Sequence, residues 1–310
     1  MGILSSVRAG LADPKLFAME AKKVYTHKLL NTPYSYVMDR DWDILVILDG
    51  CRYDLFEETQ ELDGELDGTL NPTISPASCT RQWLQESFPT EYPDTVYVSA
   101  NPQTQIHGVE DRFFRSIRVW DECWSDEHNT ARPDEVISIA IDKSQKYQNK
   151  RIIVHLVQPH YPFIGDLGQK IDHRGFHEKA RAGKPVEAES GKTIWDRLKN
   201  GQVTKKIVWE AYKENLEIAL SNVETLIEEL DGKIVITSDH GNALGEGGIY
   251  GHPCGLYHYS LVKVPWFETE FEERREIIAE KIASTTDSND NRIKERLADL
   301  GYVDLESDDQ

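Results

Sequence analysis

The chain has 310 residues, of which 39% are hydrophobic and 29% charged, and its formal net charge is −19. This composition provides for a hydrophobic core and excludes wholesale disorder. The excess of acidic side chains repels nucleic-acid phosphates, which excludes binding of DNA or RNA as the function. Strong acidity also fits a halophilic source, because high salt screens the repulsion between like charges.

The first predicted element is an N-terminal amphipathic helical segment that spans residues 1–40. Four apolar side chains recur in it at the spacing of one helix face: Phe17, Ala21, Val24 and Tyr25. We expect this helix to pack on its own domain. Basic residues outnumber acidic ones in residues 1–30, so peripheral contact with a membrane surface is the alternative.

Targeting and redox signals are weak along the chain. It has no run of about 18 apolar residues that would span a membrane, and its N-terminus lacks the continuous apolar region of a signal peptide. The cysteines are scattered and form no CxxC pair: Cys51, Cys79, Cys123 and Cys254. These features predict free thiols and a cytoplasmic location.

Three short apolar runs predict buried central strands, at residues 43–49, 151–157 and 233–239. Between them, amphipathic patterns predict a short helix at 81–88 and a long helix at 205–230. Strands that alternate with helices are typical of an α/β fold. We therefore predict a mostly parallel central sheet with helices on both faces.

The remaining organisation follows from composition. Residues 164–204 are polar and are expected to form an excursion over the carboxyl edge of the sheet, in the manner of a lid. Residues 41–304 are expected to form one folded domain, and residues 305–310 are an acidic tail.

The residues that suit chemistry gather at the predicted strand ends. Asp49 ends the first strand, while Asp239 and His240 end the third. Thr80 opens the short helix, and His160 lies three residues beyond the second strand. Because open α/β sheets bind ligands beyond the carboxyl ends of their strands, these residues are expected to share one site.

This set of side chains suits a divalent metal ion. Carboxylates, an imidazole and a hydroxyl favour Zn²⁺ or Mn²⁺, and Mg²⁺ or Ca²⁺ is possible. A metal-bound hydroxyl loses its proton more easily and becomes a nucleophile. Taken singly, Asp49 also suits a turn and Thr80 a helix N-cap. His155, within the second strand, is expected to be a core histidine.

Five segments resemble the alkaline phosphatase and sulfatase superfamily, in its sulfatase-like branch. They occur in the family's order, and the resemblance extends from residue 43 to about residue 303, nearly the whole chain. The segments are VILDGCRYDLF (46–56), SPASCTRQWLQESF (75–88), VHLVQPHYPF (154–163), ITSDHGNALGEGGIYGHP (236–253) and RLADLGYV (296–303). The Ser-Asp-His-Gly signature in the fourth segment is the most specific of them.

The resemblance implies an alkaline-phosphatase-like fold and a metal-dependent hydrolase or phosphotransferase. Its implied metal ligands are Asp49, Thr80, Asp239 and His240. Thr80 would be the nucleophile, and His160 and His252 would contact the substrate or a second, weaker metal. The set is similar to that of phosphoethanolamine transferases and lipoteichoic acid synthases, which implies a small-molecule, glycan or lipid phosphoester as substrate.

Departures from the family pattern leave alternatives open. Type I sulfatases carry Cys-x-Pro-Ser-Arg, whose cysteine becomes formylglycine, whereas Cys79 is followed here by Thr80. Ser78 is the alternative nucleophile. A two-metal phosphatase site would place an aspartate shortly before His160, where this chain has Gln158. The rival functions are a sulfatase acting on sulfated sugars and a non-catalytic metal-binding scaffold in surface-glycan assembly.

Overall fold

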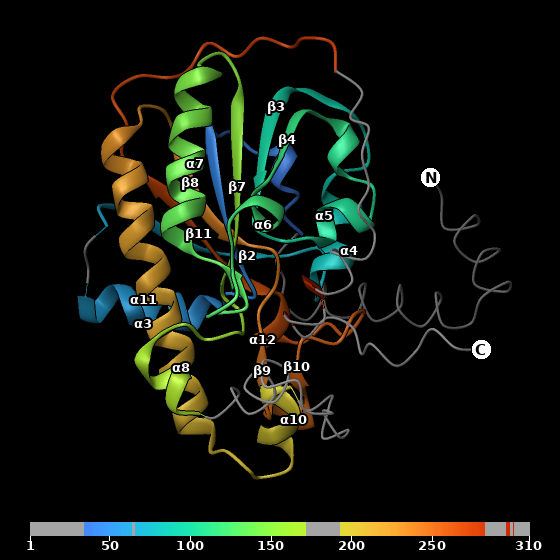
Figure 1. Cartoon of the computed structure of the whole chain (residues 1–310), viewed down its shortest axis with the longest axis vertical. Coiled ribbons are helices and arrows are strands. Elements are labelled where there is room, and N and C mark those ends of the chain that lie inside the picture. The colour runs from blue at the N-terminus through green and yellow to red at the C-terminus, as the bar shows by residue number, and fades with distance from the viewer. Residues whose placement is uncertain (1–33, 64–65, 172–192, 283–295, 298–299, 301–310) are drawn as a thin grey trace, which may run out of the picture.

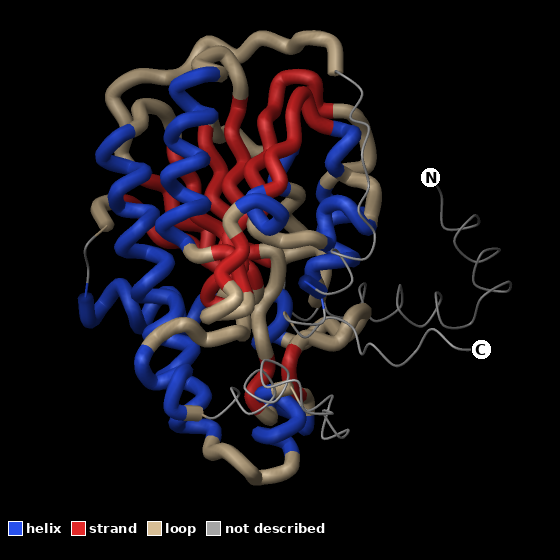
Figure 2. Tube along the Cα trace, viewed as in Figure 1, coloured by secondary structure: helices blue, strands red, loops and turns tan. Residues whose placement is uncertain are grey.

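A seven-stranded sheet forms the centre of the molecule, and helices cover both of its faces (Figures 1 and 2). This is a computed structural model, and it describes residues 34–63, 66–171, 193–282, 296–297 and 300. The arrangement confirms the predicted α/β class.

The sheet is mostly parallel. Within the seven-stranded sheet, β11 runs antiparallel to its neighbours β2 and β8, and the other neighbouring strands pair in parallel. In spatial order the strands are β2 (Gly68–Ile74), β11 (Lys263–Thr269), β8 (Ile234–Ser238), β1 (Ile44–Asp49), β7 (Arg151–Pro159), β3 (Tyr92–Ser99) and β4 (Phe113–Arg118). The three strands predicted from apolar runs are β1, β7 and β8, and they lie side by side at the centre.

Strand β1 shows why an uninterrupted apolar run forms a central strand. Every one of its residues is buried, because both faces of the sheet are covered by helices. Val46 faces the cluster that includes residues of α7 and α11. Ile47 faces the opposite cluster, which contains Trp83 and Leu84 of α4.

The longer helices of the described residues each lie between two strands in sequence. They are α3 (Tyr53–Asp63), α4 (Thr80–Ser87), α7 (Pro133–Lys146) and α11 (Lys205–Glu229). The two predicted helices are thus confirmed as α4 and α11. Thr204 caps α11, since its side chain accepts a hydrogen bond from the backbone N–H of Ile207 at 3.3 Å.

Short elements complete the fold. The short α-helices are α5 (Gln103–Ile106), α6 (Val119–Glu122), α8 (Asp166–Lys170), α10 (Ile194–Lys199) and α12 (Tyr259–Val262). Three 3-10 turns are η1 (Val37–Asp39), η2 (Glu110–Arg112) and η3 (Glu246–Gly248). Two small hairpins pair β5 (Trp124–Ser125) with β6 (Thr130–Ala131), and β9 (Ala243–Leu244) with β10 (Tyr250–Gly251).

Several predictions fall on residues outside the described ranges. These are residues 1–33 of the N-terminal segment, 172–192 of the predicted excursion, and the tail 305–310. Within the described end of the N-terminal segment, Tyr34 bridges to Ile74, and η1 follows. Across the part of the chain that the structure describes, no helix is long and apolar enough to cross a membrane.

The cysteines correct one prediction. Cys79 and Cys254 form a disulfide, whereas Cys51 and Cys123 are free thiols as expected. The bonded pair is 175 residues apart in sequence. The prediction of four free thiols was therefore wrong. Cysteine spacing reveals local motifs, but it does not reveal a pairing between distant segments.

Candidate metal centre and active site

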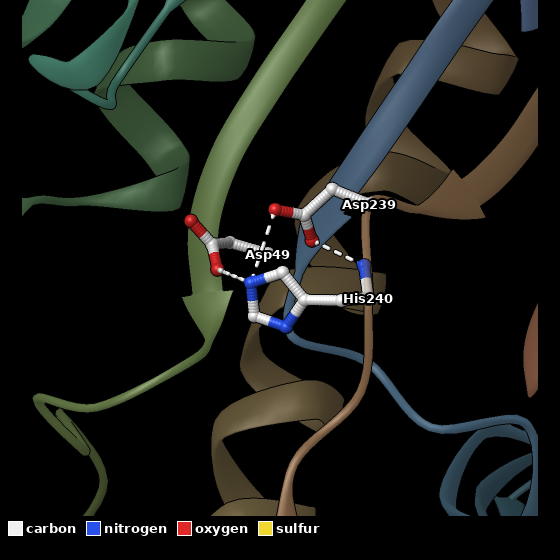
Figure 3. Close-up of side chains that lie close together, drawn as sticks. All are labelled: Asp49, Asp239 and His240. Carbon is white, nitrogen blue, oxygen red and sulfur yellow. Dashed lines mark hydrogen bonds and ion pairs between the residues drawn. The ribbon is translucent and has the colours of Figure 1, made fainter. Parts of the chain in front are cut away.

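Two neighbouring strands bring acidic and imidazole groups together at their carboxyl ends. Asp49 is the last residue of β1, and Asp239 and His240 directly follow β8. The two strands are parallel and in register, with Leu48 opposite Ser238. The three side chains therefore meet at one edge of the sheet, as Figure 3 shows, and all three are fully buried.

The imidazole of His240 presents a lone pair to both carboxylates. Its Nδ1 lies 3.0 Å from the carbonyl oxygen of Gly241, and because a carbonyl only accepts, Nδ1 carries the proton. Nε2 is then unprotonated. It lies 3.3 Å from Oδ2 of Asp239 and 3.7 Å from Oδ1 of Asp49.

Lone-pair atoms of the three side chains thus converge, and such a set of atoms suits a bound cation. The ligand atoms of Asp49, Asp239 and His240 lie within 4.8 Å of one another. Burial lowers the pKa of His240 to about 3, which keeps the imidazole neutral and able to bind a metal. Two carboxylates and one neutral imidazole fit a divalent ion such as Zn²⁺ or Mn²⁺.

Backbone groups fix the orientation of Asp239. Its Oδ1 accepts hydrogen bonds from the backbone N–H groups of Gly50 at 2.9 Å and His240 at 2.8 Å. Oδ2 accepts none from the described residues and faces the site. Gly50 has a φ of +67°, and a Cβ there would lie 2.5 Å from the side chain of Asn242. Glycine is therefore required for this close approach.

Thr80 places its hydroxyl among the same donor atoms. Its Oγ1 lies 3.1 Å from Nε2 of His240 and 3.4 Å from Oδ2 of Asp49, and the side chain is fully buried. The N-cap of α4 is Cys79 rather than Thr80. The alternative interpretation of Thr80 as a capping residue is therefore wrong, and its hydroxyl is directed to the metal centre instead.

Ser78 has a different environment. Its hydroxyl donates to the carbonyl oxygen of Pro253 at 2.9 Å and accepts from the backbone N–H of Leu256 at 3.2 Å. Both of these contacts belong to the loop that follows His252. Ser78 is thus engaged in holding two segments together, whereas the hydroxyl of Thr80 faces Asp49 and His240.

His160 and His252 meet beside the metal centre. Their Nε2 atoms are 2.8 Å apart, and the ring of His252 stacks on that of His240 with centroids 4.5 Å apart. Nδ1 of His160 lies 2.5 Å from the carbonyl oxygen of Tyr161, so Nδ1 holds the proton. Burial lowers the pKa of His160 to about 3. His252 therefore supplies the proton of the contact between the two rings.

Asn215 supports His160 and was not predicted. Its Nδ2 donates to the carbonyl oxygens of Pro159 at 3.1 Å and His160 at 3.0 Å. Its Oδ1 accepts from the backbone N–H of Ile164 at 2.9 Å. The signal in the sequence was a single amide on the buried face of the long helix, because a buried polar side chain needs partners.

Asn101 supports Asp49 and was also missed. Its Nδ2 donates to Oδ2 of Asp49 at 2.7 Å. Its Oδ1 accepts from the backbone N–H of Gln103 at 3.0 Å, which fixes the amide in the orientation that points its nitrogen at the carboxylate. Asn101 lies just beyond the carboxyl end of β3, a strand that the sequence analysis did not predict.

His155 is buried, as predicted for a core histidine, yet it lies close to the metal centre. Its Nδ1 is 2.7 Å from the hydroxyl of Tyr97, and its Nε2 is 4.0 Å from Oδ2 of Asp49. Burial lowers the pKa of His155 to about 4. A neutral ring therefore forms part of the wall behind Asp49.

Gln158 stands where a two-metal phosphatase site would have an aspartate. It directs its amide nitrogen toward the hydroxyl of Thr130, at 3.4 Å.

We expect Asn101→Ala to weaken metal binding by about 10-fold to 100-fold, because it removes the group that orients a ligand carboxylate. Competition with a chelator would measure the affinity. The matched control is Asn222→Ala, whose amide only donates to the carbonyl of Ile218 at 2.8 Å. Equal metal affinity in Asn101→Ala and the control would contradict a supporting role for Asn101.

Comparisons with known proteins gave structural matches alone. No protein-family model and no curated protein sequence matches this chain. The periplasmic domain of phosphoethanolamine transferase EptC from Campylobacter jejuni is similar, with a TM-score of 0.48, 16% identity, and coverage of 73% of this chain and 77% of that one. The lipoteichoic acid synthase LtaP from Listeria monocytogenes has a TM-score of 0.45 and 10% identity over 82% and 72% of the two chains.

A third similar structure is the periplasmic domain of EcEptC from Escherichia coli in complex with Zn. Its TM-score is 0.44, with 13% identity over 78% of this chain and 77% of that one. Two of these three similar structures are periplasmic domains. The predicted cytoplasmic location of this chain is wrong, because Cys79 and Cys254 form a disulfide and disulfides persist in oxidising compartments. The mostly parallel seven-stranded sheet confirms the predicted α/β class, and the structures that are similar to this chain include a phosphoethanolamine transferase and a lipoteichoic acid synthase.

Proposed function

We propose that this chain is a metal-dependent hydrolase or phosphotransferase that acts on a phosphate-type ester through Thr80. The observation that carries the proposal is the position of the Thr80 hydroxyl, 3.1 Å from His240 and 3.4 Å from Asp49 in a fully buried site. A hydroxyl in such a place has no structural use as a cap, and it lies where an activated nucleophile is needed.

The ion would be held by four side chains, which come from three segments of the chain: Asp49, Thr80, and the neighbours Asp239 and His240. Bound there, a divalent metal would lower the pKa of the Thr80 hydroxyl and neutralise charge on a phosphoryl oxygen. We favour Zn²⁺ or Mn²⁺, since the set mixes carboxylates with an imidazole, and a similar structure is a complex with Zn.

The proposed reaction has two balanced steps. The Oγ1 of Thr80 gives up its proton and attacks phosphorus while the bond from phosphorus to the leaving oxygen breaks, and the leaving oxygen takes up a proton, which gives a phosphothreonine and an alcohol. Water or an acceptor alcohol then attacks the same phosphorus and releases Thr80. Thr80 is the first residue of α4, so the helix N-terminus also favours the negative charge of the phosphoryl group.

His160 and His252 are proposed to bind the substrate beside the nucleophile. His252 holds a proton at Nε2 and directs it to Nε2 of His160, 2.8 Å away. It is therefore the member of the pair that can donate a hydrogen bond to a substrate oxygen. Asn215 fixes the backbone of His160 through the bond at 3.0 Å to its carbonyl oxygen, which keeps the pair in place.

The disulfide argues against the sulfatase alternative. Conversion of a cysteine to formylglycine needs a free thiol, whereas Cys79 is bonded to Cys254. The scaffold alternative is disfavoured because a hydroxyl that can act as a nucleophile and a pair of histidines that can bind the substrate both lie beside the carboxylates. By analogy with the similar transferase and synthase, we propose a lipid, glycan or small-molecule phosphoester as the substrate.

We expect turnover of phosphomonoesters or phosphodiesters to exceed turnover of sulfate esters. The measurement is a screen of p-nitrophenyl phosphate, bis-p-nitrophenyl phosphate and p-nitrophenyl sulfate with Zn²⁺, Mn²⁺, Mg²⁺ or Ca²⁺ supplied in turn. Metal-free protein is the control. Preferential release of sulfate, or formylglycine found at Cys79 by mass spectrometry, would contradict the proposal.

A further inference from the structure

Two segments that carry site residues are bonded to each other outside the metal centre. We call residues 76–82 the nucleophile segment and residues 252–257 the histidine loop. The Cys79–Cys254 disulfide joins them across 175 residues of sequence. Cys79 directly precedes Thr80, and Cys254 lies two positions after His252. The covalent bond therefore lies within two residues of each of these site residues.

Hydrogen bonds on both sides of the disulfide reinforce the contact. Before Cys79, the hydroxyl of Ser78 bonds the carbonyl of Pro253 at 2.9 Å and the N–H of Leu256 at 3.2 Å. These groups flank Cys254 in the histidine loop. A buried hydroxyl that both donates and accepts across an interface holds the two backbones at a fixed distance.

Tyr257 adds a second set of bonds further along. Its hydroxyl donates to the carbonyl oxygen of Pro76 at 3.2 Å and lies 2.6 Å from Nε2 of Gln82. Tyr257 is 9% exposed, so these bonds are shielded from water. The nucleophile segment is thus bonded to the histidine loop at its start, middle and end.

The carboxylate ligands are held by other means. Asp49 belongs to β1, and Asp239 accepts backbone bonds from Gly50 and His240 at 2.9 and 2.8 Å. The ladder between β1 and β8 fixes their relative position. Loss of the disulfide would therefore leave Asp49, Asp239 and His240 together, but it would free Thr80 to move relative to His252.

We propose that the Cys79–Cys254 disulfide is a positioning clamp that holds the nucleophile against the substrate-binding histidine, so that full turnover requires the oxidised protein. This inference rests on the proposed function. Misplacing a reacting group by about 1 Å can cost on the order of 100-fold in rate. Reduction is therefore expected to lower kcat by about 10-fold to 100-fold, while metal content stays the same.

The first test uses the whole protein and a phosphine reductant, tris(2-carboxyethyl)phosphine. The phosphine and one water give the phosphine oxide, and the disulfide gains two electrons and two protons to become two thiols. Titration of thiols under denaturing conditions follows the reaction, and elemental analysis follows the metal. We expect kcat for the best phosphoester to fall with the disulfide and to return on reoxidation.

The second test is the double variant Cys79→Ser and Cys254→Ser. Serine is favoured at a helix N-cap, the position that Cys79 occupies, so the start of α4 is retained. The matched control is Cys123→Ser, since Cys123 is a free thiol. The double variant should lose kcat and become insensitive to the phosphine, whereas the control should behave as the wild type.

Hydrogen exchange supplies a readout that does not depend on activity. Reduction should increase exchange in the nucleophile segment and the histidine loop together, while β1 and β8 stay protected. Unchanged kcat and unchanged exchange on reduction would overturn the clamp. So would loss of metal or global unfolding in step with loss of activity, since the bond would then serve stability alone. If the oxidised wild type turns over no ester, the proposed function fails. The change in hydrogen exchange on reduction then still shows whether the disulfide holds the nucleophile segment against the histidine loop.

Discussion

Thr80→Ala should lower turnover of the phosphoester substrate by about three orders of magnitude or more, because the variant lacks the oxygen that attacks phosphorus. Its fold should persist. Thr80 is not the N-cap of α4 and its side chain makes no capping bond, so helix stability does not depend on the hydroxyl. Steady-state kinetics, with circular dichroism as the check on folding, would measure the effect.

Two further variants make the Thr80 result specific. Thr80→Ser retains a hydroxyl and should retain substantial turnover. Thr59→Ala is the matched control, since Thr59 is a buried threonine of α3 whose hydroxyl donates to the carbonyl of Leu55 at 2.9 Å. A trapped phosphoryl group on Ser78, or full activity in Thr80→Ala, would refute the assignment of the nucleophile.

Asp239→Ala should remove most of the bound metal and with it nearly all activity. The variant loses the carboxylate whose Oδ2 faces Nε2 of His240 at 3.3 Å, and the remaining ligands cannot complete the coordination of the ion. Elemental analysis after dialysis would give the metal content per chain. Retention of one metal per chain in Asp239→Ala would exclude this site.

Asp43→Asn provides the matched control for the metal experiment. Asp43 is also a fully buried aspartate, but it precedes the opposite end of β1, where its carboxylate accepts hydrogen bonds from Arg274 at 2.7 Å and from the backbone of Lys233 at 2.9 Å. Its pKa is lowered by the hydrogen bond from Arg274 against the opposing effect of burial. The variant should be less stable than the wild type but should bind metal normally.

The central strands could be predicted because they are covered on both faces and read as continuous apolar runs. The outer part of the sheet carries no such signal. Strand β2 is mostly exposed and contains Pro72, and β11 contains Pro265, which pairs with it. Proline and mixed polarity argue against a strand when a sequence is read alone. The structure identifies β2 and β11 as strands through their hydrogen-bonded pairing.

The part of the candidate site that lies at the ends of the apolar strands could be predicted from the sequence. Asp49, Asp239 and His240 each end or follow an apolar run, so their convergence followed from the parallel sheet. The contact of Asn101 with Asp49 and the pairing of Cys79 with Cys254 could not be predicted. Both depend on how separate segments pack, and neither residue lies in a pattern that specifies its partner.

The distances in sequence between the metal ligands have a consequence for how the protein is made. The bond between Gly50 and Asp239 spans 189 residues, and the contact between Thr80 and His240 spans 160. During synthesis, a chain that has emerged only as far as β7 offers Asp49 and Thr80 without the other two ligands. Capture of the proposed metal would therefore come late, after long-range strand pairing has been completed. Binding of the ion would report on completed folding and would not nucleate it.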